Sequence, residues 1–134
     1  MAIADTAETD EAAASEVIFS IGSNCGCRYE NVKKGITWLS GLLTDFRCSA
    51  IYATPDCHGG SKEYLNAVAR GLTSLPPDRL ESICKKYEEA NGRDEISRKM
   101  GDVPIDIDLV VYGKRILRTK DYKCEFFRIG YGMI

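Results

Sequence analysis

The sequence lacks several features that would place it in a common functional class. It has no apolar run of the roughly 18 residues that a membrane-spanning helix needs, and one histidine, His58, among its 134 residues. The segment "GSNCGCRY" contains no lysine and does not have the spacing of a Walker-type phosphate loop. No dense basic run marks a nucleic-acid surface. We therefore expect neither a membrane nor a nucleic acid as partner.

The N-terminal segment "MAIADTAETDEAAASE" has five acidic and no basic side chains, and it lacks the basic start and apolar stretch of a secretory signal. We expect residues 1–16 to form a disordered acidic tail and residues 17–134 to form one domain. Without this tail, 15 acidic and 18 basic residues remain, a formal charge of +3 against −2 for the whole chain. This mild positive charge suits an anionic ligand such as a nucleotide.

The six cysteines allow three disulfides or a metal site in principle. They form no Cys-x-x-Cys pair and accompany no export signal, so scattered reduced thiols are the favoured interpretation and zinc binding the less favoured one. On the same grounds we expect a cytoplasmic protein.

Hydrophobic periodicity predicts the element order β-α-β-β-α-β, followed by a short irregular tail. This order indicates an α+β fold of the ferredoxin-like type, an antiparallel sheet with two helices on one face. A polar segment, "GRDEISRKMGD", joins the second helix to the last strand and is either a surface connection or a mobile loop. The expected strands are 17–21, 46–54, 63–74 and 103–113, and the expected helices are 29–44 and 77–91.

The last strand, "VPIDIDLVVYG", carries two aspartates one residue apart. Because side chains alternate between the faces of a strand, Asp106 and Asp108 share a face with Val110, opposite Ile105, Ile107, Leu109 and Val111. Their Cα atoms are expected about 6.6 to 6.8 Å apart, close enough to hold a shared divalent ion or bridge two ions. Magnesium is the natural candidate. The alternative is that this face simply points to solvent at a sheet edge.

Cations lie directly upstream of the two aspartates, at Arg93, Arg98 and Lys99. Carboxylates that can hold a metal, next to cations that can neutralise phosphate, are what phosphoryl or pyrophosphoryl transfer requires. Catalysis of that reaction consists mostly of positioning and charge neutralisation. The pattern therefore favours a phosphate-transferring enzyme.

Six short segments in order resemble one family, from Val17 to about Thr119. The chain is similar to the 6-hydroxymethyl-7,8-dihydropterin pyrophosphokinases, which move a pyrophosphoryl group from ATP to a pterin alcohol in folate biosynthesis. The matching segments are "IGSN", "IYATP", "EYLNAV", "LTSLPPDRL", "YEEANGR" and "IDIDLVVYG".

The resemblance implies a role for each matching residue. Asp106 and Asp108 would hold two Mg²⁺ ions that bridge the ATP phosphates and the pterin hydroxyl, with Arg93 as the first arginine of a catalytic loop. Beyond the matching residues, the other cations of this loop, Arg98 and Lys99, would cover the transferring phosphates together with Arg93. The pterin-binding residues would be Thr54, Pro55, Tyr64 and Asn66, and the remaining ATP-binding residues would be Glu88 and Leu109.

The chain departs from the family pattern at basic and aromatic positions. Glu95 stands where a second loop arginine is usual, Val103 where an arginine precedes the first aspartate, and Met100 where a tryptophan is usual. The C-terminal end is shorter and lacks the family's Pro-His segment, and Arg128, with Phe126 or Phe127, are the candidate replacements. The leading hypothesis is a divergent ATP- and Mg²⁺-dependent pyrophosphokinase acting on small molecules. A weakened or inactive pterin- or nucleotide-binding module, and a transferase for another small alcohol, are the alternatives.

Overall fold

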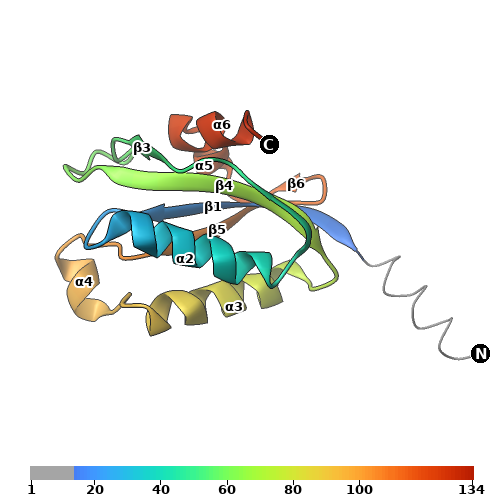
Figure 1. Cartoon of the computed structure of the whole chain (residues 1–134), viewed down its shortest axis with the longest axis horizontal. Helices are drawn as coiled ribbons and strands as arrows, with labels where there is room; N and C mark the ends of the chain where they lie inside the picture. The colour runs from blue at the N-terminus through green and yellow to red at the C-terminus, as the bar shows by residue number, and fades with distance from the viewer. Residues whose placement is uncertain (1–13) are drawn as a thin grey trace, which may run out of the picture.

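The computed structural model describes residues 14–134 and has one antiparallel sheet with helices on both faces (Figure 1). The sheet has six strands in the order β2-β4-β1-β5-β6, and β3 also pairs with β4. This order confirms the predicted α+β, ferredoxin-like fold. The elements are β1 (Ser15–Ser23), α2 (Arg28–Ser40), β2 (Thr44–Cys48), β3 (Tyr52–Thr54), β4 (Tyr64–Thr73), α3 (Pro77–Ala90), α4 (Glu95–Lys99), β5 (Asp106–Tyr112), β6 (Arg115–Ile116), α5 (Thr119–Lys123) and α6 (Glu125–Tyr131).

The predicted acidic tail lies mostly outside the described residues. Its last two residues, however, belong to β1, where Ser15 pairs with Thr73 and Glu16 with Leu72. The domain therefore begins at least two residues earlier than predicted. Within residues 14–134, no helix has the length and apolar content that crossing a membrane requires.

The main hydrophobic core lies between the sheet and helices α2 and α3. Val32 and Leu39 of α2 and Leu80 of α3 are fully buried, at the helical spacing that the sequence predicts. The helices also contact each other, because the Trp38 and Tyr87 rings stack with centroids 4.3 Å apart. At Gly35 an added Cβ would lie 3.1 Å from Ile105 Cδ1, so a residue without a side chain brings α2 close to the sheet.

A second, smaller core lies on the opposite face, under α5 and α6 (Figure 1). It consists of Ile18, Val68, Val110 and the fully buried Phe127. The prediction of a short irregular tail is therefore wrong. Apolar and aromatic side chains after residue 120 give these two short helices a buried side, which covers the sheet face that α2 and α3 leave open. The partly buried side chains packed against this core are Val111, Tyr122, Phe126, Tyr131 and Ile134.

The structure also differs from the prediction in the first helix, the second strand and the polar segment. The first helix ends at Ser40 rather than Thr44, and the Gly41 N–H closes it on the Trp38 carbonyl at 3.1 Å. The predicted strand 46–54 is broken at Ser49, whose hydroxyl accepts the Val68 N–H at 2.9 Å. The polar segment contains α4, because a reciprocal capping box between Asp94 and Ser97 starts a short helix there.

A β-bulge corrects the predicted faces of β5. The pairing with β1 shifts between Ile18, opposite Val111, and Phe19, opposite Leu109. Val110 is the extra residue, and beyond it the alternation changes phase. As a result Val111 packs against the smaller core with Val110, not with Ile107 and Leu109 as predicted.

Candidate active site

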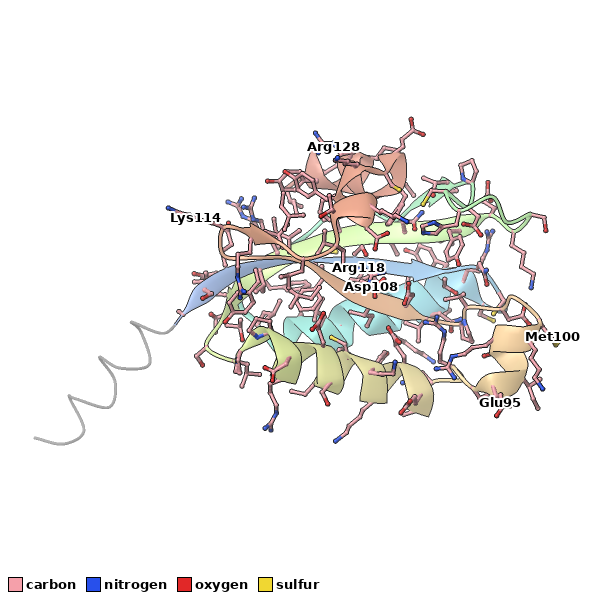
Figure 2. All side chains as sticks on the ribbon, turned by 180° about the vertical axis from the view of Figure 1, so that it is seen from behind. Glu95, Met100, Asp108, Lys114, Arg118 and Arg128 are labelled. Carbon is pink, nitrogen blue, oxygen red and sulfur yellow. The ribbon has the colours of Figure 1, made fainter. Side chains whose placement is uncertain are left out.

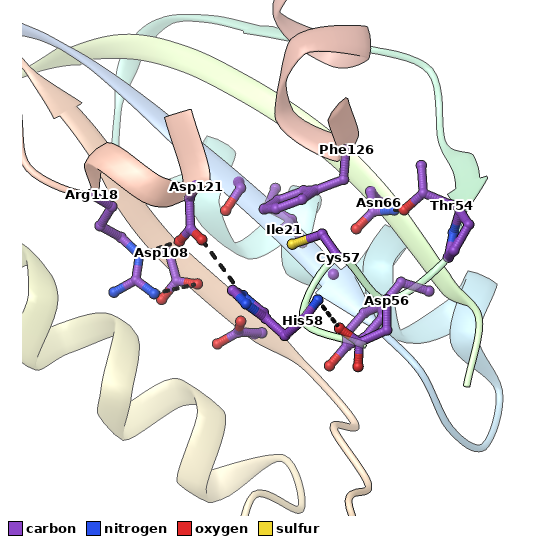
Figure 3. A pocket seen from close by; sticks show the side chains of 15 residues that line it. Ile21, Thr54, Asp56, Cys57, His58, Asn66, Asp108, Arg118, Asp121 and Phe126 are labelled. Carbon is purple, nitrogen blue, oxygen red and sulfur yellow. Dashed lines mark hydrogen bonds and ion pairs between the residues drawn. The ribbon is translucent and has the colours of Figure 1, made fainter. Parts of the chain in front are cut away.

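A pocket opens on the sheet face that also carries α5 and α6 (Figure 3). Its floor is formed by β1, β4 and β5, and its sides by the β3–β4 loop and the two C-terminal helices. Six of the metal- and substrate-binding residues predicted from the sequence line it, namely Thr54, Pro55, Tyr64, Asn66, Asp106 and Asp108. The two aspartates therefore face a pocket and not open solvent.

The aspartates belong to a cluster of three carboxylates. Asp106 and Asp108 lie opposite Gly22 and Ser20 of β1, and Glu88 reaches them from α3. One carboxylate oxygen from each of the three residues lies within 4.8 Å of the others. Glu88 is held in place because its Oε2 accepts the backbone N–H of Ile107 at 2.8 Å. The sequence placed Glu88 near the cleft but did not predict that it joins the aspartates.

The electrostatics of this cluster favour a cation. Burial, followed by the charge of neighbouring Asp106, raises the pKa of Asp108 to about 9. Burial and Asp106 also raise the pKa of Glu88 to about 7, although the Ile107 N–H opposes this shift. Three acids this close repel one another when ionised. Oxygen ligands in such a group suit a hard divalent ion such as Mg²⁺.

Arg93 supplies part of the positive charge next to the cluster. Its Nη1 donates to Asp106 Oδ1 at 3.0 Å and lies 3.5 Å from Glu88 Oε1. Burial opposes its charge, but Asp106 and Glu88 outweigh this and raise the pKa of Arg93. The structure thus brings Arg93 to the aspartates, although its cationic group is already engaged by carboxylates.

A second arginine, Arg118, lies beside Asp108 and was not predicted from the sequence. Its Nη2 is 3.8 Å from Asp108 Oδ2, and its Nε donates to Asp121, whose carboxylate is buried (Figures 2 and 3). Burial opposes the charge of Arg118, but Asp108 and Asp121 raise its pKa. The signal that was missed is Arg-x-x-Asp at the start of α5, since residues three apart on a helix are neighbours.

Arg118 and Asp108 also line a second cavity, a groove between α3 and the part of β5 that does not pair with β6. Leu109 and Glu88, both expected near ATP, lie in this groove together with Lys85. The pocket and the groove thus meet at Asp108 and Arg118. A ligand in the pocket and another in the groove would approach each other there.

The pocket wall opposite the aspartates is polar and aromatic. Asn66 Nδ2 donates to Thr54 Oγ1 at 2.6 Å, and both side chains are buried. Burial, and then the charges of Asp56 and Asp106, raise the pKa of Tyr64 to about 12, so its phenol stays protonated. A Cβ on Gly22 would lie 3.3 Å from Asn66 Oδ1, so glycine at this position lets the Asn66 side chain approach β1 closely. Phe126 of α6 lines the other side.

The cations of residues 93–103, the connection between α3 and β5, are not all at the site. Arg98 and Lys99 lie on α4 with exposed side chains and line neither the pocket nor the groove. Lys99 lies 3.9 Å from Glu95, one helical turn away, and Met100 at the end of this helix is exposed (Figure 2). Val103 forms a hydrogen bond through its backbone, because its N–H donates to Asn24 Oδ1 at 2.6 Å.

The candidate replacements for the family's C-terminal segment, Phe126, Phe127 and Arg128, lie in different places. Phe126 lines the pocket, whereas Phe127 is buried in the smaller core. Arg128 lies on α6, 5.3 Å above the Tyr122 ring and away from Arg118 and Asp108 (Figure 2). Of the cations in this C-terminal part of the chain, Arg118 and not Arg128 therefore lies beside Asp108.

Comparison with known proteins connects this site to one family. Residues 18–129 match the family model of 7,8-dihydro-6-hydroxymethylpterin-pyrophosphokinase (HPPK). The chain is 34% identical over 105 residues to the 2-amino-4-hydroxy-6-hydroxymethyldihydropteridine pyrophosphokinase of Aquifex aeolicus, covering 78% of this chain and 65% of that protein.

Longer proteins match the same region. The chain is 36% identical over 101 residues to a folate synthesis bifunctional protein of Arabidopsis thaliana, covering 74% of this chain and 21% of that protein. A folate synthesis bifunctional protein of Chlamydia trachomatis is 35% identical over 115 residues, with 81% of this chain and 25% of that protein covered. The chain thus spans a quarter or less of these bifunctional relatives.

Proposed function

Because the chain belongs to the 7,8-dihydro-6-hydroxymethylpterin-pyrophosphokinase family, we propose that it transfers pyrophosphate from ATP to 6-hydroxymethyl-7,8-dihydropterin, a step of folate biosynthesis. The observation that carries this proposal is the meeting of pocket and groove at Asp108 and Arg118. Two substrates that bind on either side of these residues present their reacting groups to the same carboxylates and cations.

The pterin occupies the pocket. The Asn66 amide and the Thr54 hydroxyl offer donors and acceptors to the edge of a flat heterocycle, and Tyr64 and Phe126 offer ring faces on which it can stack. Pro55 borders the entrance. In this orientation the hydroxymethyl group points toward Asp106 and Asp108.

ATP occupies the groove between α3 and β5. Backbone groups at Leu109, in the part of β5 that does not pair with β6, meet the adenine, and Glu88 lies in the same groove. The phosphates then extend to the position where groove and pocket meet. This orientation places the β-phosphorus next to the pterin hydroxyl.

Asp106 and Asp108 would hold two Mg²⁺ ions, with Glu88 beside them as a third carboxylate. When bound, the metal neutralises phosphate charge and lowers the pKa of the attacking hydroxyl. The protein's own part is to orient the hydroxyl in line with the bond that breaks. The hydroxyl oxygen bonds to the β-phosphorus, the bond from this phosphorus to the α–β bridging oxygen breaks, and AMP leaves without a covalent enzyme intermediate.

Arg93 and Arg118 flank the two aspartates and balance the charge of the transferring phosphates. Arg118 thereby supplies part of the positive charge that is missing at Val103 and Glu95, where the family usually has arginines. Arg98 and Lys99 contribute if α4 turns toward the groove when ATP binds. Their distance from the aspartates makes them secondary in this proposal.

The test is to incubate the protein with Mg²⁺, ATP and 6-hydroxymethyl-7,8-dihydropterin and to measure AMP. We expect AMP from the wild type and a loss of at least a thousandfold in Asp106→Ala, because about 4 kcal/mol or more of charge neutralisation is removed. Glu95→Gln is the control, since Glu95 is an exposed carboxylate on α4 and should keep activity within twofold.

A second candidate function is pterin or nucleotide binding without catalysis. It is favoured by Val103 and by the engagement of Arg93 with Asp106, which together reduce the positive charge available to phosphate. Calorimetric binding of the pterin with no AMP at high enzyme concentration would support this candidate over the pyrophosphokinase. Turnover of ATP with a different small alcohol, and none with the pterin, would indicate another acceptor.

A further inference from the structure

Two cysteines from distant parts of the chain meet beside the pocket. Cys124 Sγ lies 3.2 Å from Cys57 Sγ, although the two residues are 67 positions apart in sequence. Cys57 belongs to the β3–β4 loop, and Cys124 stands between α5 and α6. All six cysteines of the chain are free thiols. Sulfur atoms at this distance need a small movement to form a covalent bond.

The residues around this pair belong to the pocket. Asp56, Cys57 and His58 line it from the loop, and Asp121 and Phe126 line it from the helices on either side of Cys124. Figure 3 shows the Cys57 side chain among these residues, between Phe126 and His58. A bond between the two sulfurs would therefore join two adjoining walls of the pocket, the β3–β4 loop and the C-terminal helices.

The loop makes few other connections near its tip. A turn within the loop is closed by the Gly59 N–H on the Asp56 carbonyl at 3.1 Å. His58 Nε2 lies 3.9 Å from Asp121 Oδ1, a contact between the same loop and α5. Gly59 has a φ of +88° and no neighbour within 4 Å of an added Cβ. The tip thus contacts the C-terminal helices through Cys57 and His58. The far end of the loop is anchored elsewhere, because Lys62 pairs with Asp102 and Glu63 with Arg28.

We propose that Cys57 and Cys124 are a redox modification site, whose reversible disulfide locks the β3–β4 loop over the pocket and slows exchange of the ligand inside it. The cross-link stands on the contact between the two thiols. Its effect on the pterin rests on the proposed function. The reduced state, with a movable loop, is the form that takes up ligand.

The chemistry requires an oxidant, which we identify by class as a hydroperoxide. One thiol attacks the peroxide O–O bond and becomes a sulfenic acid, with release of an alcohol or water. The other thiol displaces water from the sulfenic sulfur, and the S–S bond forms. Both thiols lose a proton and one electron each, and the peroxide takes up the two electrons. Thiol reagents such as dithiothreitol reverse the step by exchange.

The site is distinct from the metal-binding candidate. Within residues 14–134, the ligand atoms of Glu88, Asp106 and Asp108 lie close enough together to share one ion. This group contains neither cysteine. Burial and the neighbouring Cys124 raise the pKa of Cys57 to about 12, so its sulfur rests as a protonated thiol. Because the thiolate and not the protonated thiol attacks a peroxide, this shift slows the reaction at Cys57.

The cross-link is tested by treating the full chain with hydrogen peroxide, removing the oxidant, and mapping peptides by mass spectrometry without reduction. We expect a Cys57–Cys124 peptide pair lighter by about 2 Da, because two hydrogens are lost. The melting temperature should rise by about 10 °C, since a long loop is closed. Cys124→Ser should abolish both effects, and Cys27→Ser, at an exposed cysteine, should leave them intact. A disulfide mapped to other cysteines would overturn the proposal.

The lock is tested by stopped-flow fluorescence with 6-hydroxymethylpterin as the probe. We expect oxidation to slow association at least tenfold, dithiothreitol to restore it, and Cys124→Ser to remove the response. A mapped cross-link with an unchanged association rate would disprove the lock. If the reduced protein does not bind the pterin at all, the proposed function fails, while peptide mapping and melting still decide whether the cross-link exists.

Discussion

The pocket wall and the 93–103 connection were both singled out from the sequence, but they differ in how the structure holds them. Thr54 and Asn66 are buried, lie on adjacent strands and bond to each other. On the connection, Arg93 is held by Asp106, whereas Arg98 and Lys99 project from a short exposed helix. One region is a buried, hydrogen-bonded wall and the other is largely solvent-facing.

This difference separates two requirements of the proposed reaction. Recognition of a flat acceptor needs donors and acceptors fixed in place, which paired strands supply. Neutralisation of phosphate charge needs cations close to the carboxylates, and here one of the two comes from a different part of the chain, at Arg118. The cations beside the two aspartates therefore come from the chain segments before and after β5, and not from the 93–103 connection alone.

Among the changes that test this difference, removal of Arg118 should lower catalytic activity most. We expect Arg118→Ala to lower kcat about a hundredfold, because a charge-assisted contact to phosphate contributes about 1.5 to 3 kcal/mol. Arg118→Lys should recover part of the loss, since it keeps the charge but not the fork geometry. The measurement is AMP formation under saturating ATP and pterin.

The matched control for Arg118 is Arg128→Ala on α6. Arg128 is an exposed arginine that contacts Tyr122 and lies outside the pocket, so activity should stay within twofold. Equal losses in the two variants would mean that Arg118 acts through general surface charge. The cations of the 93–103 connection, and not Arg118, would then neutralise the phosphate charge.

Asn66→Ala should have the next largest effect, on binding and not on chemistry. It removes an amide from the pocket wall and leaves Thr54 Oγ1 without its partner. We expect the Kd for 6-hydroxymethylpterin to rise about 10- to 100-fold, because an unpaired buried polar group costs about 1 to 3 kcal/mol. Calorimetry measures this change.

The Asn66 result needs a control for folding and for the residue type. The affinity for a non-hydrolysable ATP analogue should change little in Asn66→Ala, since Asn66 does not line the groove. Asn91→Ala, at the exposed end of α3, should leave pterin binding unchanged. Parallel loss of both ligands in Asn66→Ala would indicate misfolding of the wall and no specific role in recognition.

The sequence predicted the regular parts of this fold because their signals are local. Alternation in β5 placed Asp106 and Asp108 on one face, and helical spacing in α3 placed Leu80 and Cys84 in the core. These patterns depend on neighbours within one element. The pocket-lining Thr54 and Asn66 came from family resemblance, since nothing local distinguishes them from other polar strand residues.

The parts that were missed depend on pairing between distant elements. The bulge at Val110 results from the registration of β5 on β1, and it reverses the predicted face of Val111. Arg118 approaches Asp108 because β6 turns the chain back before α5 begins. The contact of Cys57 with Cys124 likewise requires α5 and α6 to pack on the second sheet face. No spacing in the sequence expresses these distances.

The smallest expected effect belongs to the cations on α4. Arg98→Ala combined with Lys99→Ala should lower kcat/KM no more than about threefold, because exposed charged groups and their ion pairs contribute about 0 to 1 kcal/mol. Lys33→Ala combined with Lys34→Ala, on exposed positions of α2, controls for the loss of two positive charges. A loss above tenfold in the α4 variant alone would mean that α4 moves to the phosphates during turnover. In that case the connection acts as a closing segment, and the contrast with the buried wall becomes one between a fixed and a moving half of the same site.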